Sequence, residues 1–523
     1  METPLKMNLK SLLNDLPITV DVTGNLPDMD ITGIQFDSRK VEPGNLFVAM
    51  TGGSVDGHDY IPAAVDKGAA AVVGTREINT LDVPYIRVKD AREALAWLAA
   101  AYYDHPGRKM TVIGVTGTDG KTTTSNLLFQ ILKTAGLKAG LVSTVNAVIG
   151  DEVMDTGFHV TTPEATEVQK ILARMVEAGL THVVLETTSH GLAQHRVTGS
   201  EYDIAVVTNI THEHLDYHGS YEGYRDAKAM LFKMLEDTVE KSCGNPRLAV
   251  LNADDQSYAF LDDLVKGRKA SYSISANGKY NAQDLRYSAS GATFRILSGS
   301  DVIPVTCSLP GNYNVSNCLA AFTTAVEGLG IDPHVAAQGI ASLSGVPGRM
   351  EFIDMGQPFM AIVDFAHTPN ALIRAIETAR EMTHGRVITV FGSAGLRDRE
   401  KRRMMAAASV KMADISILTA EDPRTESLDD ILAEMADEAV KEGGVEGRTF
   451  FRVPDRGDAI RLGVSMAQPG DLVMPCGKGH EQSMCFGTVE HPWDDRTALR
   501  AALAEHLGEL GPEMPYLPTS KNR

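Results

Sequence analysis

Residues 110–128, MTVIGVTGTDGKTTTSNLL, decide the fold of the middle of the chain. Apolar side chains from Val112 to Val115 predict a short buried strand, and the apolar spacing from Leu127 to Leu132 predicts a helix after it. The glycine-rich segment between them lets backbone N–H groups approach an anion, and the helix N-terminus adds partial positive charge. A strand, a glycine loop and a helix in this order predict a binding site for nucleotide phosphates.

Lys121 and Thr122 bring the chemistry to this loop. Lys121 places a full positive charge beside the phosphates, and the hydroxyl of Thr122 is positioned to ligate Mg²⁺. The usual phosphate-loop pattern, G-x-x-x-x-G-K-[S/T], has glycine at position 115, where this chain has valine; glycine stands instead at positions 114 and 117. The loop is therefore a relative of that pattern, and a turn that merely precedes a helix is the alternative.

The composition narrows the class of protein. A chain of 523 residues predicts about three domains, and its 43% of hydrophobic residues suffice for a core in each. The net charge of −19 argues against nucleic acid or a membrane surface as a partner. An anionic substrate would therefore need locally placed Arg, Lys and Mg²⁺.

The cysteines and the apolar runs predict the compartment. The five cysteines form no C-x-x-C pair and are odd in number, which suits a reducing environment. The N-terminus lacks the apolar core of a signal peptide, and no apolar run reaches the roughly 18 residues that span a bilayer. We therefore expect a cytoplasmic protein.

The first 105 residues alternate short apolar strands with turns and include a helix around Ala91–Tyr103. Asp37, Ser38 and Arg39 stand just after one of these strands. A serine and an arginine at a strand end can hold a diphosphate or a uracil edge. A capped turn with a surface arginine is the alternative.

From Lys109 to about Gly345, strands and helices alternate with the periods of a parallel sheet wrapped by helices. Sheets of this kind bind ligands at the carboxyl ends of their strands. Several polar residues fall at or just past such ends: Glu186, His190, Asn209, His214 and Asp254. Glu186 has the place of a carboxylate that holds Mg²⁺ or a water near the phosphates.

A dense group of histidines follows a later strand and contains His212, His214 and His218, with Glu213 and Asp216 among them. Its spacing matches no structural zinc pattern, so a role beside Mg²⁺ or the phosphates is favoured over zinc. A loop of solvated histidines is the alternative.

Lys228 stands on the apolar face of a predicted helix, because Tyr221, Tyr224, Lys228, Leu231 and Phe232 have the spacing of a single helical face. A charged ammonium on such a face is costly unless it is paired or modified. A side chain whose ammonium reaches out to solvent is the alternative.

The last third of the chain predicts a second α/β unit, beginning at about Pro347. Polar turns follow four of its strands, at residues 364–369, 392–399, 421–424 and 477–481, which argues for a second ligand surface. Ahead of this unit, Gly311–Asn317 opens a helix whose asparagines either cap it or read an adenine edge. The tail from Gly511 is expected to be disordered.

Taken together, the motifs resemble those of the Mur ligase family over essentially the whole chain. In chain order they are DSRKVEPGNLFVA, DGHDYI, GVTGTDGKTTT, TTPEA, ETTSHGLAQHRV, TNITHEHLDYHGS, YRDAKAMLF, GNYNVSN, GVPGRME, VDFAHTP, GLRDREKR, EDPR and GKGHE. TTPEA and SHGLAQHRV favour the members that add the third peptide residue.

The resemblance implies an α/β protein of three domains. Residues 1–107 would bind the UDP-muramoyl substrate, residues 108–346 would form a P-loop-type ATPase with a mostly parallel sheet, and residues 347–523 would form a Rossmann-like domain for the incoming amino acid. It also implies a monomeric, ATP-dependent ligase of peptidoglycan precursor synthesis. Such an enzyme joins a diamino acid to UDP-N-acetylmuramoyl-L-alanyl-D-glutamate through an acyl phosphate.

The functional residues of the family carry over to the matching positions. The UDP-sugar and peptide would contact Phe36, Ser38, Gly53, Ser54, Val55, Thr161, Thr162, Thr188, Gln194 and Arg196. ATP would contact Gly117, Thr118, Asp119, Gly120, Lys121, Thr122, Thr123, Asn317, Arg349 and His367. The amino acid would contact Arg397, Glu421, Asp422, Pro423, Arg424, Gly477 and Glu481.

The resemblance further implies two Mg²⁺ ions, with Thr122, Glu186, His214 and a Lys228 carbamylated by CO₂ as the residues that hold them. Lys121, Lys228, Glu186 and His214 would be the catalytic residues. Their task is electrostatic: a substrate carboxylate must approach the γ-phosphate of ATP, and both are anions. An amine then attacks the acyl phosphate and expels phosphate.

The chain departs from the family pattern at a few positions. Asp119 stands where the family usually has Asn, and residues 421–424 read EDPR where diaminopimelate-adding members typically read DNPR. Arg424 can pair with a second carboxylate, which favours meso-diaminopimelate. The extra charge of Asp422 would instead welcome the terminal amine of lysine or ornithine.

Two other functions compete with this interpretation. A folylpolyglutamate-synthase-like ligase would leave the segment DSRKVEPGNLFVA unexplained. An inactive Mur-like protein that only binds a nucleotide-sugar would not need the catalytic lysines.

Overall fold

The computed structural model of the chain describes residues 6–22, 26–52, 55–78, 80–154, 162–211, 215–275, 278–288, 291–299 and 301–520. They divide into two compact units, Met1–Ser271 with Thr323–Ile331, and Tyr272–Phe322 with Asp332–Arg523. Among the helices in the described ranges, none is both long enough and apolar enough to cross a membrane.

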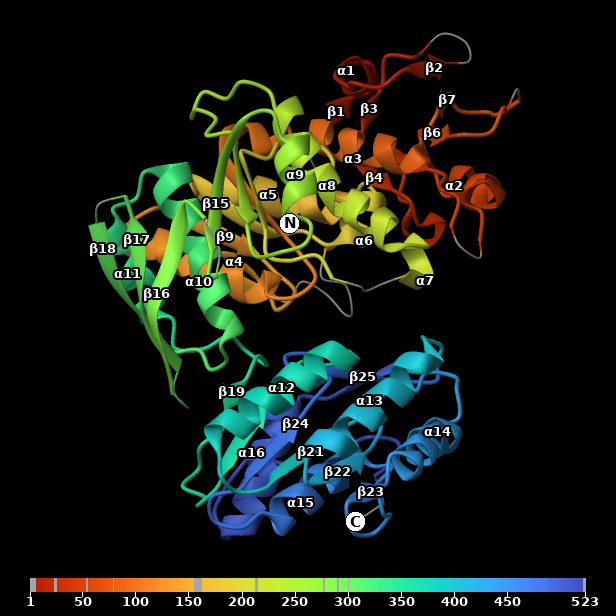
Figure 1. Cartoon of the computed structure of the whole chain (residues 1–523). Coiled ribbons are helices and arrows are strands. Elements are labelled where there is room, and N and C mark those ends of the chain that lie inside the picture. The colour runs from red at the N-terminus through yellow and green to blue at the C-terminus, as the bar shows by residue number, and fades with distance from the viewer. Residues whose placement is uncertain are drawn as a thin grey trace. The chain divides into compact units, whose positions relative to one another are not determined.

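The first unit begins with a small sheet in the order β2-β7-β6-β5-β4, coloured red to orange in Figure 1. β2 runs antiparallel to β7, and the other neighbours are parallel. Apolar side chains pack in two clusters around this sheet. The elements are β1 (Met7–Asn8), α1 (Leu9–Asn14), β2 (Val20–Val22), β3 (Asp30–Ile31), β4 (Gly33–Gln35), η1 (Ser38–Lys40), β5 (Asn45–Val48), η2 (Gly57–Tyr60), α2 (Ile61–Asp66), β6 (Ala71–Gly74), β7 (Tyr85–Val88), α3 (Ala91–Tyr102) and η3 (Pro106–Lys109).

The segment quoted first forms the centre of the second sheet of this unit. Every residue of β8 (Thr111–Thr116) is buried, and the strand lies between its parallel neighbours β12 (His182–Glu186) and β13 (Ile204–Val207). Helix α4 (Lys121–Thr134) begins at Lys121, directly after the loop. The predicted strand, loop and helix are therefore confirmed.

The remaining elements of this unit complete a mostly parallel sheet with helices packed on it. They are β9 (Ala139–Val142), the hairpin β10 (Ala147–Ile149) and β11 (Glu152–Met154), α5 (Ala165–Glu177), α6 (Ser189–Ala193), α7 (Leu215–His218), α8 (Tyr221–Asp237), β14 (Leu248–Asn252), α9 (Tyr258–Leu264), β15 (Arg268–Ser273) and the π-helical turn η4 (Thr324–Gly328). Apolar residues of α5, α8 and α9 share one core with the strands. The parallel pairs bring the carboxyl ends of β12, β8 and β13 to one edge, where the loop lies.

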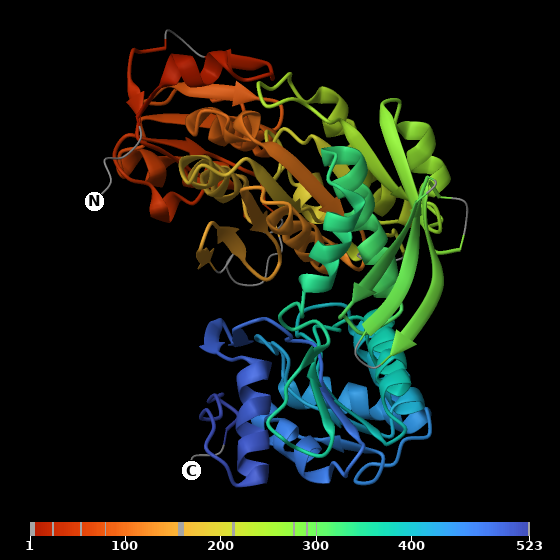
Figure 2. The same ribbon diagram turned by 90° about the vertical axis from the view of Figure 1, so that its left-hand side faces the viewer.

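The second unit opens with an antiparallel meander of β16 (Tyr280–Ser288), β17 (Gly291–Ser298) and β18 (Asp301–Cys307), drawn in green in Figure 2. The apolar runs ATFRIL (292–297) and IPVTC (303–307) favour strands, as β17 and β18 confirm, but no such run marks β16. The residues of β16 are mostly polar and partly exposed, so the strand lacks an apolar signal. α10 (Tyr313–Thr323) and α11 (Pro333–Ser342) follow the meander.

The C-terminal sheet has the order β19-β20-β24-β21-β22-β23 and is parallel except for β19. Helices α12, α13 and α14 cover one face, and α15 and α16 cover the other, each with its own apolar core (Figure 1). The elements are β19 (Glu351–Phe352), β20 (Met360–Val363), α12 (Pro369–Met382), β21 (Val387–Phe391), α13 (Arg399–Met412), β22 (Ile415–Leu418), α14 (Leu428–Lys441), β23 (Phe450–Arg452), α15 (Arg456–Met466), β24 (Leu472–Pro475), β25 (Ser483–Phe486), β26 (Val489–Pro492) and α16 (Asp495–Leu507).

The end of the chain corrects one expectation. Leu517 is fully buried, and the hydroxyls of Thr519 and Ser520 donate to Asp455 Oδ2 over 2.9 and 2.8 Å. The prediction of a disordered tail is therefore wrong for residues 517–520. The α/β fold class with mostly parallel sheets is confirmed.

Candidate active site

The phosphate loop depends on a glycine at its first turn. Gly117 has a φ of +148°, and a Cβ added there would overlap Thr208 Oγ1. Gly120, with a φ of +82°, immediately precedes α4. The loop therefore needs glycine at position 117 both for its backbone conformation and for the space beside β13.

The two residues after β13 hold the loop in place. The carbonyl of Asp119 accepts hydrogen bonds from Thr208 Oγ1 (2.6 Å) and Asn209 Nδ2 (3.0 Å). Asn209 returns the contact, since its Oδ1 accepts from the Asp119 N–H over 3.1 Å and its carbonyl accepts from the Thr118 N–H over 2.7 Å. The sequence points to Asn209 at a strand end. It does not point to Thr208, although a threonine before that asparagine was a usable signal.

Two lysines reach the loop. Lys121 Nζ donates to the Thr118 carbonyl over 2.7 Å, and Lys228 Nζ donates to the Gly117 carbonyl over 2.6 Å. Lys228 is 1% exposed, and its ammonium lies 4.5 Å from the centre of the Tyr224 ring. The expectation of a buried lysine on an apolar helix face is confirmed, and the solvent-reaching alternative is wrong.

Glu186, at the end of β12, is buried against hydroxyl groups. Its Oε1 accepts from Thr122 Oγ1 (3.0 Å) and Thr144 Oγ1 (2.8 Å), and its Oε2 accepts from the Thr144 N–H (2.9 Å). A carboxylate and two hydroxyls form an oxygen donor set of the kind that Mg²⁺ prefers. The sequence analysis missed Thr144, although this residue stands just past the end of β9 (Ala139–Val142).

A metal at this place would depend on more than protein ligands. In the described ranges, no group of three or more His, Cys, Asp or Glu residues could hold a metal ion. Mg²⁺ fits the donors around Glu186 because it commonly keeps waters and takes phosphate oxygens as its other ligands. His212 and His214 lie outside the described residues. His218 packs its ring against His190 and bonds Ser189 Oγ through Nε2 at 3.1 Å.

Four residues predicted for the sugar and peptide come together near α6. Thr188 Oγ1 contacts Thr162 Oγ1 at 3.0 Å and caps α6 through the Gly191 N–H. Arg196 donates to the Thr162 carbonyl (2.8 Å) and to Gln194 Oε1 (2.8 Å), and it forms an ion pair with Glu164 (2.9 Å). Thr161 lies outside the described residues.

The segment around Ser38, predicted to contact the UDP group, forms a capped turn. Asp37 caps η1 and accepts from Arg39 Nε at 2.9 Å, and this bond lowers the pKa of Asp37 to about 2. The side chain of Arg39 is largely exposed, so this segment is a capped turn with a surface arginine. Ser38 opens η1, Phe36 is packed at the edge of the core, and Val55 is exposed. Gly53 and Ser54 lie outside the described residues.

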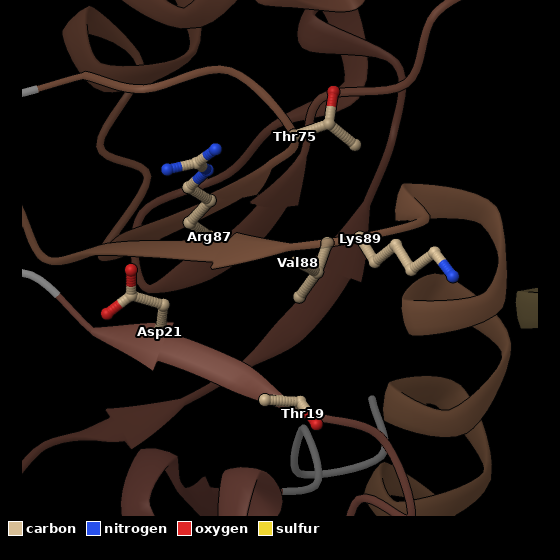
Figure 3. Close-up of a pocket in the computed structure, with 6 residues that line it drawn as sticks. All are labelled: Thr19, Asp21, Thr75, Arg87, Val88 and Lys89. Atoms are coloured by element: carbon tan, nitrogen blue, oxygen red, sulfur yellow. The ribbon is translucent and has the colours of Figure 1, made fainter.

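A hollow of about 420 Å³ lies beside the paired strands β2 and β7 of the first unit (Figure 3). Arg87 and Asp21 come from the paired strands β7 and β2, and the lining also includes Thr19, Thr75, Val88 and Lys89. None of the residues predicted for the UDP-sugar lines this hollow.

In the second unit, three polar residues from the motifs lie around the ring of Phe365. The Arg349 guanidinium lies 4.5 Å from the ring centre, and the rings of His367 and His480 lie 4.5 and 4.8 Å away. Burial lowers the pKa of His367 to about 3, so the imidazole is neutral near pH 7. Nδ1 lies 3.0 Å from the Phe365 carbonyl and therefore carries the proton, which leaves Nε2 as an acceptor.

Asn317 also belongs to the second unit. Its side-chain amide donates to Asn314 Oδ1 over 2.8 Å, and Asn314 in turn donates to the Pro310 carbonyl over 2.7 Å. These bonds tie the first turns of α10 to the segment before the helix.

Asp422, in the turn at residues 421–424, is paired with a buried lysine. Lys478, which is fully buried, bonds Asp422 Oδ1 at 3.0 Å and Glu481 Oε2 at 2.5 Å. Burial lowers the pKa of Lys478, but the two carboxylates outweigh it and raise that pKa. The Cys485 N–H also donates to Asp422 Oδ1 over 2.9 Å. This pairing argues against the alternative in which the charge of Asp422 welcomes the terminal amine of lysine or ornithine, and the choice of amino acid stays a prediction.

Arg397, Glu421 and Arg424 differ from Asp422 in their contacts. Among the described residues, none accepts a hydrogen bond from the guanidinium of Arg424 or of Arg397. Glu421 is buried, its Oε2 has no hydrogen-bond partner in the described part of the chain, and this atom lies against Gly477. Burial raises the pKa of Glu421 to about 7. Pro423 is buried behind the turn.

A network that the sequence did not reveal joins the backbone before Arg397 to Glu426, two residues after Arg424. Glu426 accepts from the Leu396 N–H over 2.9 Å and from both terminal nitrogens of Arg402 over 3.0 Å. Arg402 is fully buried and also bonds Glu434 at 3.0 Å. These contacts join residues that are 24 and 32 positions apart in the sequence, so no local spacing predicts them.

Comparisons with known proteins agree with this geometry. Residues 30–103 match the model described as "Mur ligase family, catalytic domain", residues 115–325 match "Mur ligase middle domain", and residues 348–479 match "Mur ligase, glutamate ligase domain". The chain is 45% identical over 485 residues to a UDP-N-acetylmuramyl-tripeptide synthetase of Roseiflexus sp. (strain RS-1), which covers 91% of this chain and 95% of that relative.

Two further relatives extend over nearly the full length. A UDP-N-acetylmuramoyl-L-alanyl-D-glutamate–2,6-diaminopimelate ligase of Geobacillus thermodenitrificans (strain NG80-2) is 40% identical and covers 95% of this chain and 100% of that protein. A solved structure of a ligase with the same name is 32% identical, with a TM-score of 0.65 over 96% of this chain and 100% of the other. With matches in all three segments and identity at this level over its length, the chain belongs to the Mur ligase family.

Proposed function

We propose that this chain is an ATP-dependent ligase of peptidoglycan synthesis that joins meso-diaminopimelate to UDP-N-acetylmuramoyl-L-alanyl-D-glutamate through an acyl phosphate. The relative from Geobacillus thermodenitrificans is named for this reaction. The observation that carries the proposal is the phosphate loop, whose Thr122 hydroxyl bonds a buried carboxylate and which two lysines contact. We further propose domain boundaries after residues 107 and 346.

The residues of the first unit would bind the triphosphate and promote transfer of its terminal group. The N–H groups at the start of α4 and the ammonium of Lys121 would offset the charge of two approaching anions. Within the described residues, the ammonium of Lys121 bonds only a backbone carbonyl, so it can turn to a phosphate without breaking an ion pair there. In the second unit, His367 Nε2 would accept from the amino group of adenine, with Asn317 and Arg349 beside the nucleotide.

Mg²⁺ would be held by Glu186 and Thr122, with His214 as a further ligand, and when bound it supplies positive charge that screens the phosphates. A carbamate on Lys228 would supply an anion for a second ion. The group fits, because a carbamylated lysine keeps one N–H and that N–H can still donate to the Gly117 carbonyl. The buried position on α8 would shield the carbamate from water.

The choice of diaminopimelate over lysine or ornithine rests on the charges at residues 421–424. The negative charge of Asp422 is taken up by Lys478, so it does not attract a terminal amine. The guanidinium of Arg424 is left for a carboxylate, which diaminopimelate carries at its far end and lysine lacks. Arg397, Glu421, Gly477 and Glu481 would complete the contacts to the amino acid.

The test is an amino-acid panel in a phosphate-release assay with ATP, Mg²⁺ and UDP-N-acetylmuramoyl-L-alanyl-D-glutamate. We expect release of phosphate and formation of the tripeptide product with meso-diaminopimelate. Release with lysine or ornithine alone would overturn the amino-acid assignment. Absence of release with every amino acid would favour a nucleotide-sugar-binding protein without ligase activity.

A further inference from the structure

One buried side chain anchors both turns that are proposed to bind the amino acid. Arg456, the first residue of α15, is fully buried. Its Nη1 donates to the carbonyl of Ala420 over 3.1 Å, and its Nη2 donates to the carbonyl of Cys476 over 2.8 Å. These carbonyls stand directly before residues 421–424 and 477–481.

The sheet itself does not fix these two ends to each other. Ala420 follows β22 and Cys476 follows β24, and in the strand order β21 lies between them. Backbone hydrogen bonds therefore join each strand to β21 but not to the other. Arg456 spans this gap with a single planar group at the carbonyl before each turn, in addition to the ion pair of Lys478 with Asp422 that joins the turns themselves.

Asp495 fixes the plane of that guanidinium. It accepts from Arg456 Nε at Oδ1 and from Nη2 at Oδ2, both over 2.7 Å, and it is as buried as its partner. Trp493 Nε1 donates to the same Oδ1 over 2.9 Å. A bidentate pair of this kind allows little rotation of the guanidinium. The N–H groups of Nη1 and Nη2 that contact the two carbonyls therefore point in fixed directions.

The pair is not needed merely to join two helices. Asp495 begins α16, so the pair connects α15 with α16, but a second bidentate pair, Arg461 with Glu505, already does so at the partly exposed side. A fully buried ion pair is weak evidence for stability, because desolvation offsets most of the attraction. What distinguishes the buried pair is its contact with the two turn carbonyls.

We propose that Arg456, held by Asp495, is a positioning residue for the incoming amino acid. It sets the spacing between the turn that carries Glu421 and Arg424 and the turn that carries Gly477 and Glu481. The inference rests on the proposed function, since it assumes that these turns bind the amino acid. Arg456 itself is buried and has no contact with the substrate in this proposal.

The test compares two double variants of the full chain. Arg456→Met with Asp495→Leu removes the carbonyl contacts without leaving a buried charge unpaired. Arg461→Met with Glu505→Leu is the matched control, because it removes the other pair between the same helices. Steady-state kinetics are measured with diaminopimelate, ATP and the UDP-sugar peptide varied in turn, and circular dichroism with thermal melting monitors the fold.

We expect the first variant to raise the KM for diaminopimelate at least about tenfold, with the KM for ATP and for the UDP-sugar peptide within about twofold of wild type. The control should leave all three values near wild type. Arg456→Lys, which keeps the charge but loses the planar fork, should show the same split, and it carries the test if the double variant does not fold.

An unchanged KM for diaminopimelate in a folded Arg456 variant would overturn the inference, and so would an equal rise in all three KM values. Failure of the wild-type enzyme to ligate any diamino acid is a separate result. It would overturn the proposed function and this inference with it.

Discussion

Lys228 Nζ donates to the carbonyl oxygen of Gly117 over 2.6 Å, so helix α8 contacts the phosphate loop at its first glycine. The lysine is buried on the helix face that also carries Tyr224, whose hydroxyl bonds Thr118 Oγ1 at 3.2 Å. Helix α8 therefore supports the loop at two successive residues. Any group attached to Lys228 would lie beside this loop.

The proposed carbamate on Lys228 can be observed directly. In ¹³C-bicarbonate, the wild-type protein should show a carbamate carbon signal, and Lys228→Arg should lose it, because a guanidinium does not take up CO₂. Lys233→Arg, an exposed position on the same helix, is the control and should keep the signal. A wild-type spectrum without a carbamate carbon would contradict the prediction.

Lys121→Ala should lower kcat/KM for ligation at least about 100-fold, because one preorganised positive charge beside the transferring phosphoryl group is lost. Lys133→Ala, on the exposed last turn of the same helix, should change kcat/KM little. Phosphate release and product formation are measured together. Undiminished turnover of Lys121→Ala would mean that the loop does not act on phosphates.

Gly117→Ala should reduce the free energy of unfolding by at least about 2 kcal/mol and weaken ATP binding, because the new methyl group would overlap Thr208 Oγ1 and displace the loop. Gly136→Ala is the control that separates the cost of steric crowding from the cost of backbone strain. Gly136 also has a positive φ, of +74°, but no atom lies within 4 Å of the added carbon. It should cost only about 1 kcal/mol. Equal losses in the two variants, measured by urea unfolding, would refute the crowding argument.

Glu421 should make stability depend on pH. Its pKa is about 7 in the folded chain, against an ordinary value of 4.5, so between these values the folded chain holds a proton that the unfolded chain has released. Its contribution to the free energy of unfolding therefore falls as pH rises from 4.5 to 7, by up to about 3 kcal/mol, and stays constant above.

Glu421→Gln should remove this slope, so that the variant gains stability relative to wild type as pH rises across the window. Urea unfolding at several pH values measures the difference. Glu509→Gln, at an exposed position, should show no such trend. A constant difference between Glu421→Gln and wild type would show that Glu421 ionises normally.

Asp422→Asn should leave the preference for diaminopimelate over lysine within about threefold of wild type, because the charge of Asp422 is already paired with Lys478. Arg424→Met should reduce that preference at least about tenfold, since it removes the partner of the second carboxylate. The ratio of kcat/KM values for the two amino acids gives the preference. A large change with Asp422→Asn alone would restore the view that Asp422 selects the side chain.

Local patterns in the sequence were enough for the elements that carry the phosphate chemistry. The strand, loop and helix of residues 110–128 and the buried face of Lys228 follow from residue spacing, and the structure confirms them. The gathering of Thr162, Thr188, Gln194 and Arg196 near α6 was expected only through the family resemblance.

Contacts between distant segments were beyond such patterns. The pairs Arg456–Asp495 and Asp422–Lys478 join residues 39 and 56 positions apart, and a charged residue that will be buried looks in sequence like one on the surface. The pairing of Asp422 with Lys478 was not predicted for this reason. Strand β16 was not predicted because its residues are mostly polar and do not form a continuous apolar face.

The hydrogen bonds from Thr519 and Ser520 to Asp455 connect the last described residues with the start of α15. Both hydroxyls donate to Asp455 Oδ2, and Oδ1 of the same side chain accepts from the Asp458 N–H over 2.9 Å. Because Asp455 directly precedes Arg456, deleting the segment from Thr519 onward would remove two hydrogen bonds beside the residue whose guanidinium contacts the two turn carbonyls.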